Sequence, residues 1–98
     1  MQGYVIIDSE VVDAQRLPEF VQKVSEAVAA HGGRFLVRGG QVEAIHGNWT
    51  PQRLVIIEFE SFDRAREFAA STEYAAVEEV REQAITSNVV MVEGIAAE

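Results

Sequence analysis

The chain has 98 residues, of which 48% are hydrophobic and 24% are charged, and this composition is typical of one ordinary globular domain. Sixteen acidic residues against eight basic ones give a net charge of −8 at pH 7. Such a charge repels phosphate backbones and anionic membrane surfaces. We therefore expect residues 1–98 to form a single domain, and we expect no nucleic acid and no membrane among its partners.

The absence of cysteine and the first residues narrow the setting further. Without cysteine the chain can form neither a disulfide nor a thiolate metal site, which favours a reducing compartment. Residues 1–8 have no basic region and only a short apolar run, so they predict neither a signal peptide nor a membrane span. We expect a cytoplasmic protein.

A repeat across fifty positions organises the sequence. The segment Val5-Ile6-Ile7-Asp8 is echoed by Val55-Ile56-Ile57-Glu58, and each copy leads into a helical pattern. Many β-branched residues, with polar residues on alternate positions, predict strands over residues 4–12 and 53–60. Two similar strand-helix halves are therefore expected.

The first helix is predicted between Asp13, which can cap its start, and Gly32-Gly33, which can adopt the left-handed conformation that ends helices. Pro18 lacks an amide N–H and is easiest to place in a first turn, so we expect a tight turn over residues 14–17 before the regular helix. One face is apolar at the three-and-four spacing of a helix. Its residues are Leu17, Phe20, Val21, Val24 and Val28.

Residues 34–38 and 41–46 both have strand-like sequences, and Gly39-Gly40 separates them. Such a pair of glycines can form a two-residue hairpin turn or a bulge inside one long strand, and we favour the bulge. Residues 47–52 form a better-marked turn. They predict that the preceding strand pairs antiparallel with residues 53–60.

The second half begins with Ser61, which is placed to cap a helix, and with Asp63 in the positive first turn of that helix. Ser71-Thr72 can start a further helix with its own apolar stripe. That stripe consists of Tyr74, Val77, Val80 and Ala84. Residues 88–95 form the last predicted strand.

The order strand, helix, strand, strand, helix, strand predicts an α+β protein with the ferredoxin-like βαββαβ topology and an antiparallel sheet. The helices of this topology cover one face of the sheet. Residues 5–7, 54–57 and 89–92 are nevertheless apolar on both faces, as in sheets that are buried from both sides. We therefore expect a homodimer through the open sheet faces. The alternative is that the extra apolar residues only fill strand ends.

Three segments resemble domain-of-unknown-function family 1330, which belongs to the dimeric α+β barrel group. They are residues 32–40, residues 47–53 leading to Glu58-Phe59, and residues 71–74 with Arg81. The resemblance implies a ferredoxin-like subunit, a barrel formed by two sheets with the helices outside, and no established reaction. The wider group contains cofactor-free monooxygenases, small-ring isomerases and haem-degrading enzymes, so the fold alone does not choose a chemistry.

Asp8 and Glu58 are the first chemical candidates, because each follows Val-Ile-Ile on a strand expected at the centre of the sheet. Alternation places both carboxylates on the open face, toward the barrel interior, where we expect them to be neighbours. Two close carboxylates cannot both ionise at low cost, so one of them would be a candidate proton shuttle. The alternative is that both are solvated strand ends.

The arginines are the second group of candidates. Arg34 and Arg38 alternate onto one predicted face of the second strand, and Arg53 begins the third. Guanidinium groups bind carboxylates in a fork geometry, so these residues could form an anion pocket or could hold Asp8, Glu58 or Glu43 in structural ion pairs. We expect Arg53 to bind a carboxylate, either from the protein or from a ligand.

His46 and Trp49 flank the predicted turn and could frame the mouth of a pocket, although Trp49 could instead pack over the barrel end. His31 and His46 are too few and too far apart in sequence to predict a metal site, and we expect neither a metal nor a cofactor. Tyr74 is a candidate ligand contact, with a purely packing role as the alternative.

These features favour a homodimer that binds a small apolar or anionic molecule between sheet and helices. Its candidate ligand contacts are Arg38, Arg53, Trp49 and Tyr74. An open groove lined by apolar residues would support this function.

The alternative is a cofactor-independent enzyme, similar to a monooxygenase or an isomerase, that acts on a small acidic or aromatic compound. Asp8 or Glu58 would be its proton acceptor, and His46 would be an auxiliary acid-base group. An enclosed cavity with a carboxylate inside would support this alternative, whereas a filled barrel would indicate a purely structural dimerisation module.

Overall fold

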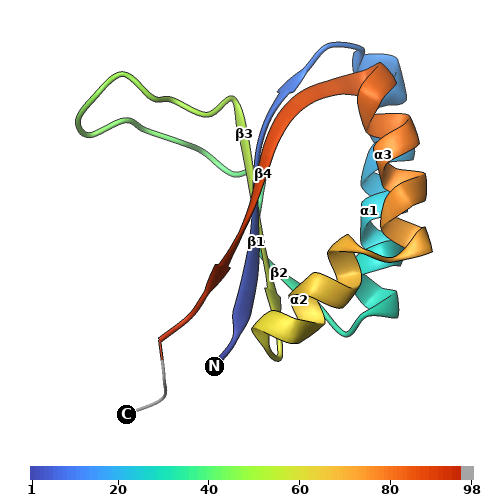
Figure 1. Ribbon diagram of the computed structural model, residues 1–98. Coiled ribbons are helices and arrows are strands. Elements are labelled where there is room, and N and C mark those ends of the chain that lie inside the picture. The colour runs from blue at the N-terminus through green and yellow to red at the C-terminus, as the bar shows by residue number, and fades with distance from the viewer. Residues whose placement is uncertain (96–98) are drawn as a thin grey trace.

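The computed structural model describes the backbone of residues 1–95 and all of their side chains except those of residues 83–86. Its strands are β1 (Gly3–Val11), β2 (Arg34–Arg38), β3 (Arg53–Phe59) and β4 (Ile85–Glu93) (Figure 1). Its helices are the short 3₁₀ helix η1 (Ala14–Arg16), α1 (Leu17–Ala30), α2 (Phe62–Ala69) and α3 (Thr72–Ala84). The ferredoxin-like α+β fold is confirmed, and β4 begins earlier than predicted.

The sheet is antiparallel and has the strand order β2-β3-β1-β4. All three α-helices lie against one of its faces, which we call the covered face (Figure 1). The other face, here the open face, carries no helix. Alternation along β1 and β3 decides which side chains point to each face.

The predicted helix ends are confirmed. Each of them depends only on residues close by in the chain. Asp13 accepts a hydrogen bond from the amide of Gln15 at 3.0 Å and starts the turn η1 that leads into α1. Gly32 ends this segment with a φ of 71°, which a residue with a Cβ adopts only with strain. Ser61 caps α2 by accepting from the amide of Arg64 at 3.1 Å.

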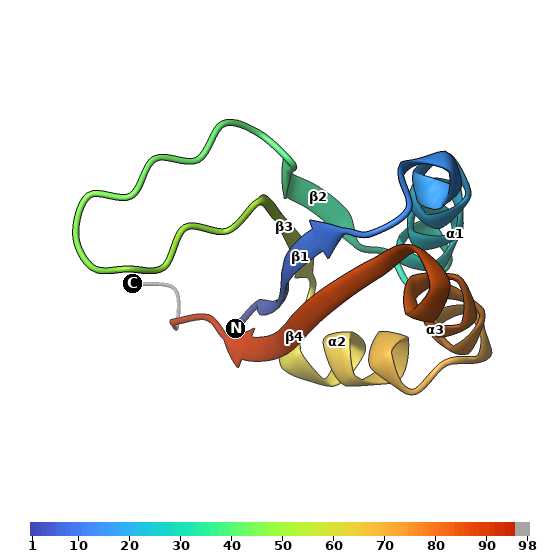
Figure 2. The ribbon, with the colours of Figure 1, turned by 90° about the horizontal axis from the view of Figure 1, so that it is seen from above.

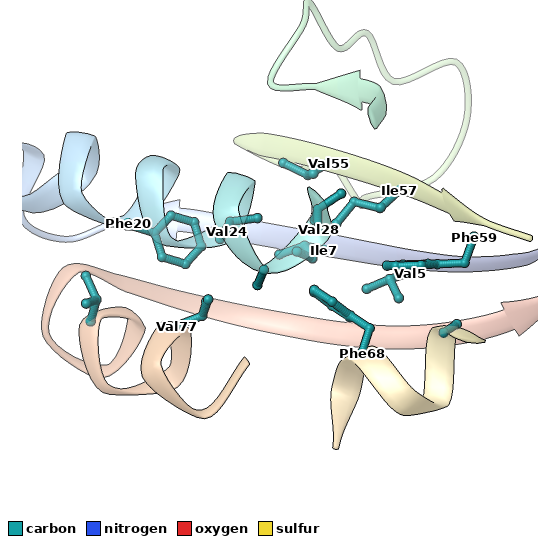
Figure 3. Packing of buried hydrophobic residues seen from close by; sticks show 13 residues of the cluster. Val5, Ile7, Phe20, Val24, Val28, Val55, Ile57, Phe59, Phe68 and Val77 are labelled. Atoms are coloured by element: carbon teal, nitrogen blue, oxygen red, sulfur yellow. The ribbon is translucent and has the colours of Figure 1, made fainter. Parts of the chain in front are cut away.

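The core fills the space between the covered face and the helices (Figure 3). Val5, Ile57 and Phe59 on the strands are almost completely buried, and Phe68 of α2 stacks on Phe59 with ring centroids 4.9 Å apart. Ala84 belongs to the apolar stripe that was predicted for the last helix, and its side chain lies outside the described residues. Among residues 1–95 no helix is long and apolar enough to cross a membrane.

Residues 41–46 are not a strand, contrary to the prediction. Gly39 takes a φ of 69° and turns the chain away directly after β2. Residues 39–52 then form one long loop that projects from the open face (Figures 1 and 2). A strand needs a neighbour for its backbone hydrogen bonds, and β3 begins only at Arg53, so the strand-like sequence of 41–46 has none.

The bulge lies within β2 and not after it. Between Phe35 and Val37 the register advances by two residues on β2 for one on β3. Arg34 therefore lies on the open face and Arg38 on the covered face. The prediction that these two arginines share a face is wrong, because the bulge reverses the alternation between them.

Candidate functional site

Asp8 and Glu58 both lie on the open face, as alternation predicts, but they are not neighbours. Asp8 is opposite Leu54, and Glu58 is opposite Tyr4. Four residues along a strand separate the two carboxylates by about 13 Å. The two similar segments lie on antiparallel strands and therefore run in opposite directions. The acidic residue that ends each segment lies at a different end of the sheet. The prediction of a carboxylate pair is therefore wrong.

Glu58 is instead the centre of a small polar cluster. Arg34 Nε donates to Glu58 Oε1 at 2.9 Å, and the Tyr4 hydroxyl donates to Glu58 Oε2 at 3.2 Å. Partial burial, and then the Glu58 carboxylate, raise the pKa of the Tyr4 phenol. Both carboxylate oxygens are thus engaged, which corresponds to the structural ion pair that the sequence left open for this residue.

Asp8 holds the long loop. Trp49 Nε1 donates to Asp8 Oδ2 at 2.8 Å. Asp8 also borders a polar hollow of about 390 Å³ at the end of the sheet. The other lining residues are Ser9, Glu10, Thr50, Gln52 and Asn88.

His46 and Trp49 together line a second hollow, of about 370 Å³. Its wall is mainly apolar and includes Ile45, Pro51 and Leu54. Asp8 and Glu58 are not part of this wall. The three candidate catalytic residues therefore lie in three different surroundings and do not form one site.

A narrow groove between the sheet and α1 brings together a different set of residues. It is lined by Ile7, Phe20, Val21, Val24, Ser25, Phe35, Arg38, Arg53 and Val55. Its free volume is about 10 Å³, which is room for roughly one water molecule. The groove therefore combines an apolar floor with two guanidinium groups.

Arg38 and Arg53 reach the groove from the two neighbouring strands β2 and β3. The Arg38 guanidinium carbon lies 3.7 Å from the centroid of the Phe35 ring, in a cation–π contact. Burial, and then the positive charge of Arg38, lower the pKa of Arg53. The two cations therefore repel each other in a partly desolvated place.

Among the side chains that the structure describes, neither groove arginine forms an ion pair with a carboxylate. Every other arginine does: the pairs are Arg16–Glu19, Arg34–Glu58, Arg64–Glu67, Arg66–Asp63 and Arg81–Glu78. The arginines without a carboxylate are thus the two that lie together in the groove.

Tyr74 does not line the groove. Its ring packs on Phe68 with centroids 5.0 Å apart, and its amide donates to Ser71 Oγ at 3.1 Å. Burial, and then Glu78, raise the pKa of its phenol. The packing alternative therefore describes Tyr74 better than a ligand contact does.

Sequence reasoning missed Phe35 and the α1 residues as part of a site. Phe20 and Val21 belong to the apolar stripe of α1, which predicts core positions without distinguishing a groove from filled space. Phe35 meets Arg38 only because of the bulge, and no local signal in the sequence marks that bulge.

The sequence profile of DUF1330, described as a domain of unknown function, matches residues 2–95. No curated protein matches the chain as a relative. A solved protein of unknown function from Rhodopseudomonas palustris is similar, with a TM-score of 0.75 and 14% identity over 98% of this chain and 84% of that one.

Two further solved structures have the same fold. A dimeric ferredoxin-like protein of unknown function from Thermobifida fusca gives a TM-score of 0.64 at 15% identity, over 95% of this chain and 91% of that one. SnoaB, a cofactor-independent oxygenase from Streptomyces nogalater, gives 0.61 at 12% identity, over 98% and 95%. At these identities the similarity establishes the fold and no reaction.

Proposed function

Since the chain belongs to the DUF1330 family, whose function is unknown, we propose a function from its geometry: it is a homodimer that binds a small amphipathic anion in the groove beside α1. The observation that carries this proposal is the pair Arg38 and Arg53, two adjacent guanidinium groups without a carboxylate among the described side chains.

The charge balance of the chain makes this pair informative. With sixteen acidic residues available, an acidic partner for Arg38 or Arg53 would be easy to supply. An anion with two oxygens would relieve the repulsion between the two cations and would accept several charge-assisted hydrogen bonds. The apolar floor of Phe20, Val24 and Val55 suits an aromatic or aliphatic body attached to that anion.

The groove must open to admit such a ligand, because ligand pockets usually measure about 300–1,000 Å³. Arg38 and Phe35 line it from β2, which is the short edge strand of the sheet, and contact each other there. An edge strand is paired on one side, so its side chains can move without breaking a second ladder of hydrogen bonds. We infer that this stacked pair swings aside when the ligand enters.

The homodimer is supported by the open face. Val37, Ile56, Ile6 and Val90 lie opposite one another across all four strands and form a continuous aliphatic band. Val90 remains 55% exposed in the single chain. A second copy is the simplest cover for such a band, and solved proteins of this fold from Thermobifida fusca and Bacteroides fragilis are described as dimeric.

Binding of benzoate, with neutral benzamide as the matched probe, tests the anion site by calorimetry. We expect benzoate to bind the protein and benzamide to bind much more weakly. Arg38→Gln and Arg53→Lys should each weaken benzoate by about 10–100-fold, because each removes a charge-assisted or forked hydrogen bond.

Arg64→Gln is the matched control, since Arg64 lies on α2 and pairs with Glu67 away from the groove. It should leave benzoate binding unchanged. Equal binding of benzoate and benzamide, or wild-type affinity in Arg53→Lys, would contradict the proposal.

The enzyme alternative has less support. No carboxylate is among the residues that line the groove, and Asp8, Glu58 and His46 lie apart from one another. We therefore expect Glu58→Gln to bind benzoate as the wild type does. A loss of benzoate binding in that variant would contradict this expectation and would support a role for the Glu58 carboxylate in the site.

A further inference from the structure

The loop of residues 39–52, which we call the arm, has no role in the groove. It runs from the end of β2 to the start of β3 without a helix or strand of its own. Loops longer than about 12–15 residues are uncommon inside compact domains and are usually functional. The arm stands out from the open face, on the side away from the helices (Figures 1 and 2).

The base of the arm is fixed to the sheet at three points. The Gly39 amide donates to the Leu54 carbonyl, Trp49 Nε1 donates to Asp8 Oδ2, and the Val11 amide donates to Gln52 Oε1, each at 2.8 Å. These bonds reach both β1 and β3. The direction in which the arm projects is therefore set by the sheet.

The arm exposes apolar side chains that a single copy leaves in water. Ile45 is 99% exposed and Trp49 is 63% exposed. Within residues 39–52 the sequence places one acidic residue, Glu43, and no lysine or arginine, although the whole chain carries a net charge of −8. Leu54, at the foot of the arm, belongs both to the apolar hollow and to the open face, so the two surfaces are continuous.

The area of the open face indicates what the arm is for. Four strands about 4.8 Å apart, with up to nine residues of about 3.3 Å each, offer on the order of 500 Å². A stable protein interface takes about 800 Å² from each partner. The open face can therefore supply much of such an interface, and the arm is the apolar surface that adjoins it through Leu54.

We propose that the arm clasps a second copy of this chain, so that Ile45 and Trp49 are buried against the partner in the homodimer. This inference rests on the proposed homodimer and adds a contact to it. A second copy seated on the open face lies beside the arm, because the arm rises from the rim of that face. Twofold symmetry then gives two such clasps in each dimer.

A single introduced thiol tests the clasp, since the natural chain has no cysteine. In Ile45→Cys, the thiol should react with a water-soluble disulfide reagent about tenfold or more slowly in the dimer than after dissociation by dilution, because the partner covers it. Val12→Cys is the control. Val12 is 68% exposed and follows the end of β1, where the chain leaves the sheet for η1, so its replacement should react equally fast in both states.

Ile45→Asp provides a second measurement, by sedimentation. Ile45 is fully exposed in one copy, so this change should leave the circular dichroism of the chain intact while raising the dissociation constant of the dimer about tenfold or more. Val12→Asp should leave the constant unchanged.

The outcomes separate the two proposals. If the wild type is a dimer, and the thiol of Ile45→Cys reacts as fast as that of Val12→Cys, the clasp is wrong and the homodimer stands. If the wild type is a monomer at micromolar concentration, both are wrong.

Discussion

The two faces of the sheet are built from the same strands but differ in how far their side chains are buried. On the covered face Val5, Ile57 and Phe59 are at most 1% exposed, because α1, α2 and α3 pack on them. On the open face their sequence neighbours Ile6 and Ile56 have similar side chains but are only partly buried. For these aliphatic residues, helix cover and not side-chain chemistry therefore decides the degree of burial.

The difference teaches that the chain completes one layer of its core within a single copy and leaves an aliphatic band on the open face in contact with water. The covered face gains its stability within a single copy. The open face combines an aliphatic band with the ion pair of Arg34 and Glu58, and this mixture of apolar and polar groups is typical of surfaces that meet another protein. Neighbouring residues such as Ile56 and Ile57 thus give a direct way to test the two faces separately.

The largest effect is expected for Ile57→Lys. The ammonium group would lie in the core between β3 and the helices without a partner, at a cost of several kcal/mol out of a typical total stability of about 5–15 kcal/mol. We expect an unfolded or molten chain by near-ultraviolet circular dichroism. A native spectrum with wild-type melting would contradict this assignment of the covered face.

Ile56→Lys changes the adjacent residue on the open face and should act on assembly instead. The ammonium can reach water in a single copy but would be buried unpaired between two sheets. We expect a folded monomer, measured by light scattering together with circular dichroism. Dimers as tight as those of the wild type would show that the open face is not the interface.

Tyr74→Phe is expected to have a smaller effect, which depends on pH. The folded-state pKa of Tyr74 is raised above its ordinary value of 10.0, so its contribution to stability is full below about pH 10 and is lost as pH rises above that value. Denaturant titrations at about pH 8 and above about pH 10 should show this alkaline loss in the wild type and a weaker loss in the variant.

Tyr4 gives the matched comparison on the open face. The chain has two tyrosines, so replacing one of them allows the titration of the other to be measured alone. In Tyr74→Phe the remaining Tyr4 phenol should titrate above 10.0, because burial and the Glu58 carboxylate both raise its pKa. An ordinary titration of Tyr4, measured by ultraviolet absorbance, would mean that its contact with Glu58 is not maintained in solution.

The smallest effect is expected for the ion pair of Arg34 and Glu58. The Arg34 side chain is 73% exposed, so water screens the pair in a single copy. A double-mutant cycle with Arg34→Ala and Glu58→Ala should give a coupling of about 0–1 kcal/mol. A coupling well above that range would indicate that the dimer buries the pair.

Local signals in the sequence account for most of the fold. Asp13 and Ser61 cap helices, Gly32 ends one, and the alternation along β1 and β3 separates the covered face from the open face. Each of these predictions depends on neighbours in the chain, for which residue chemistry and backbone geometry suffice.

The candidate site was harder to predict because it depends on register. Asp8 and Glu58 occupy equivalent positions in the repeated segment, yet antiparallel pairing sends them to opposite ends of the sheet. The groove also depends on register, since Arg38 and Arg53 meet only after the bulge has moved Arg38 to the covered face. Residue identity does not encode either offset.

The bulge in β2 makes the register of a strand a determinant of the proposed anion site. If β2 paired with β3 in regular register, without the bulge and with every residue kept, Arg38 would lie opposite Leu54 on the same face as Arg34. The groove would then keep Arg53 alone, and the open face would gain a second guanidinium. Deletion of Leu36, in contrast, would remove the bulge and keep Arg38 on the covered face, so the register of β2, and not the set of arginines alone, decides whether the proposed anion site forms.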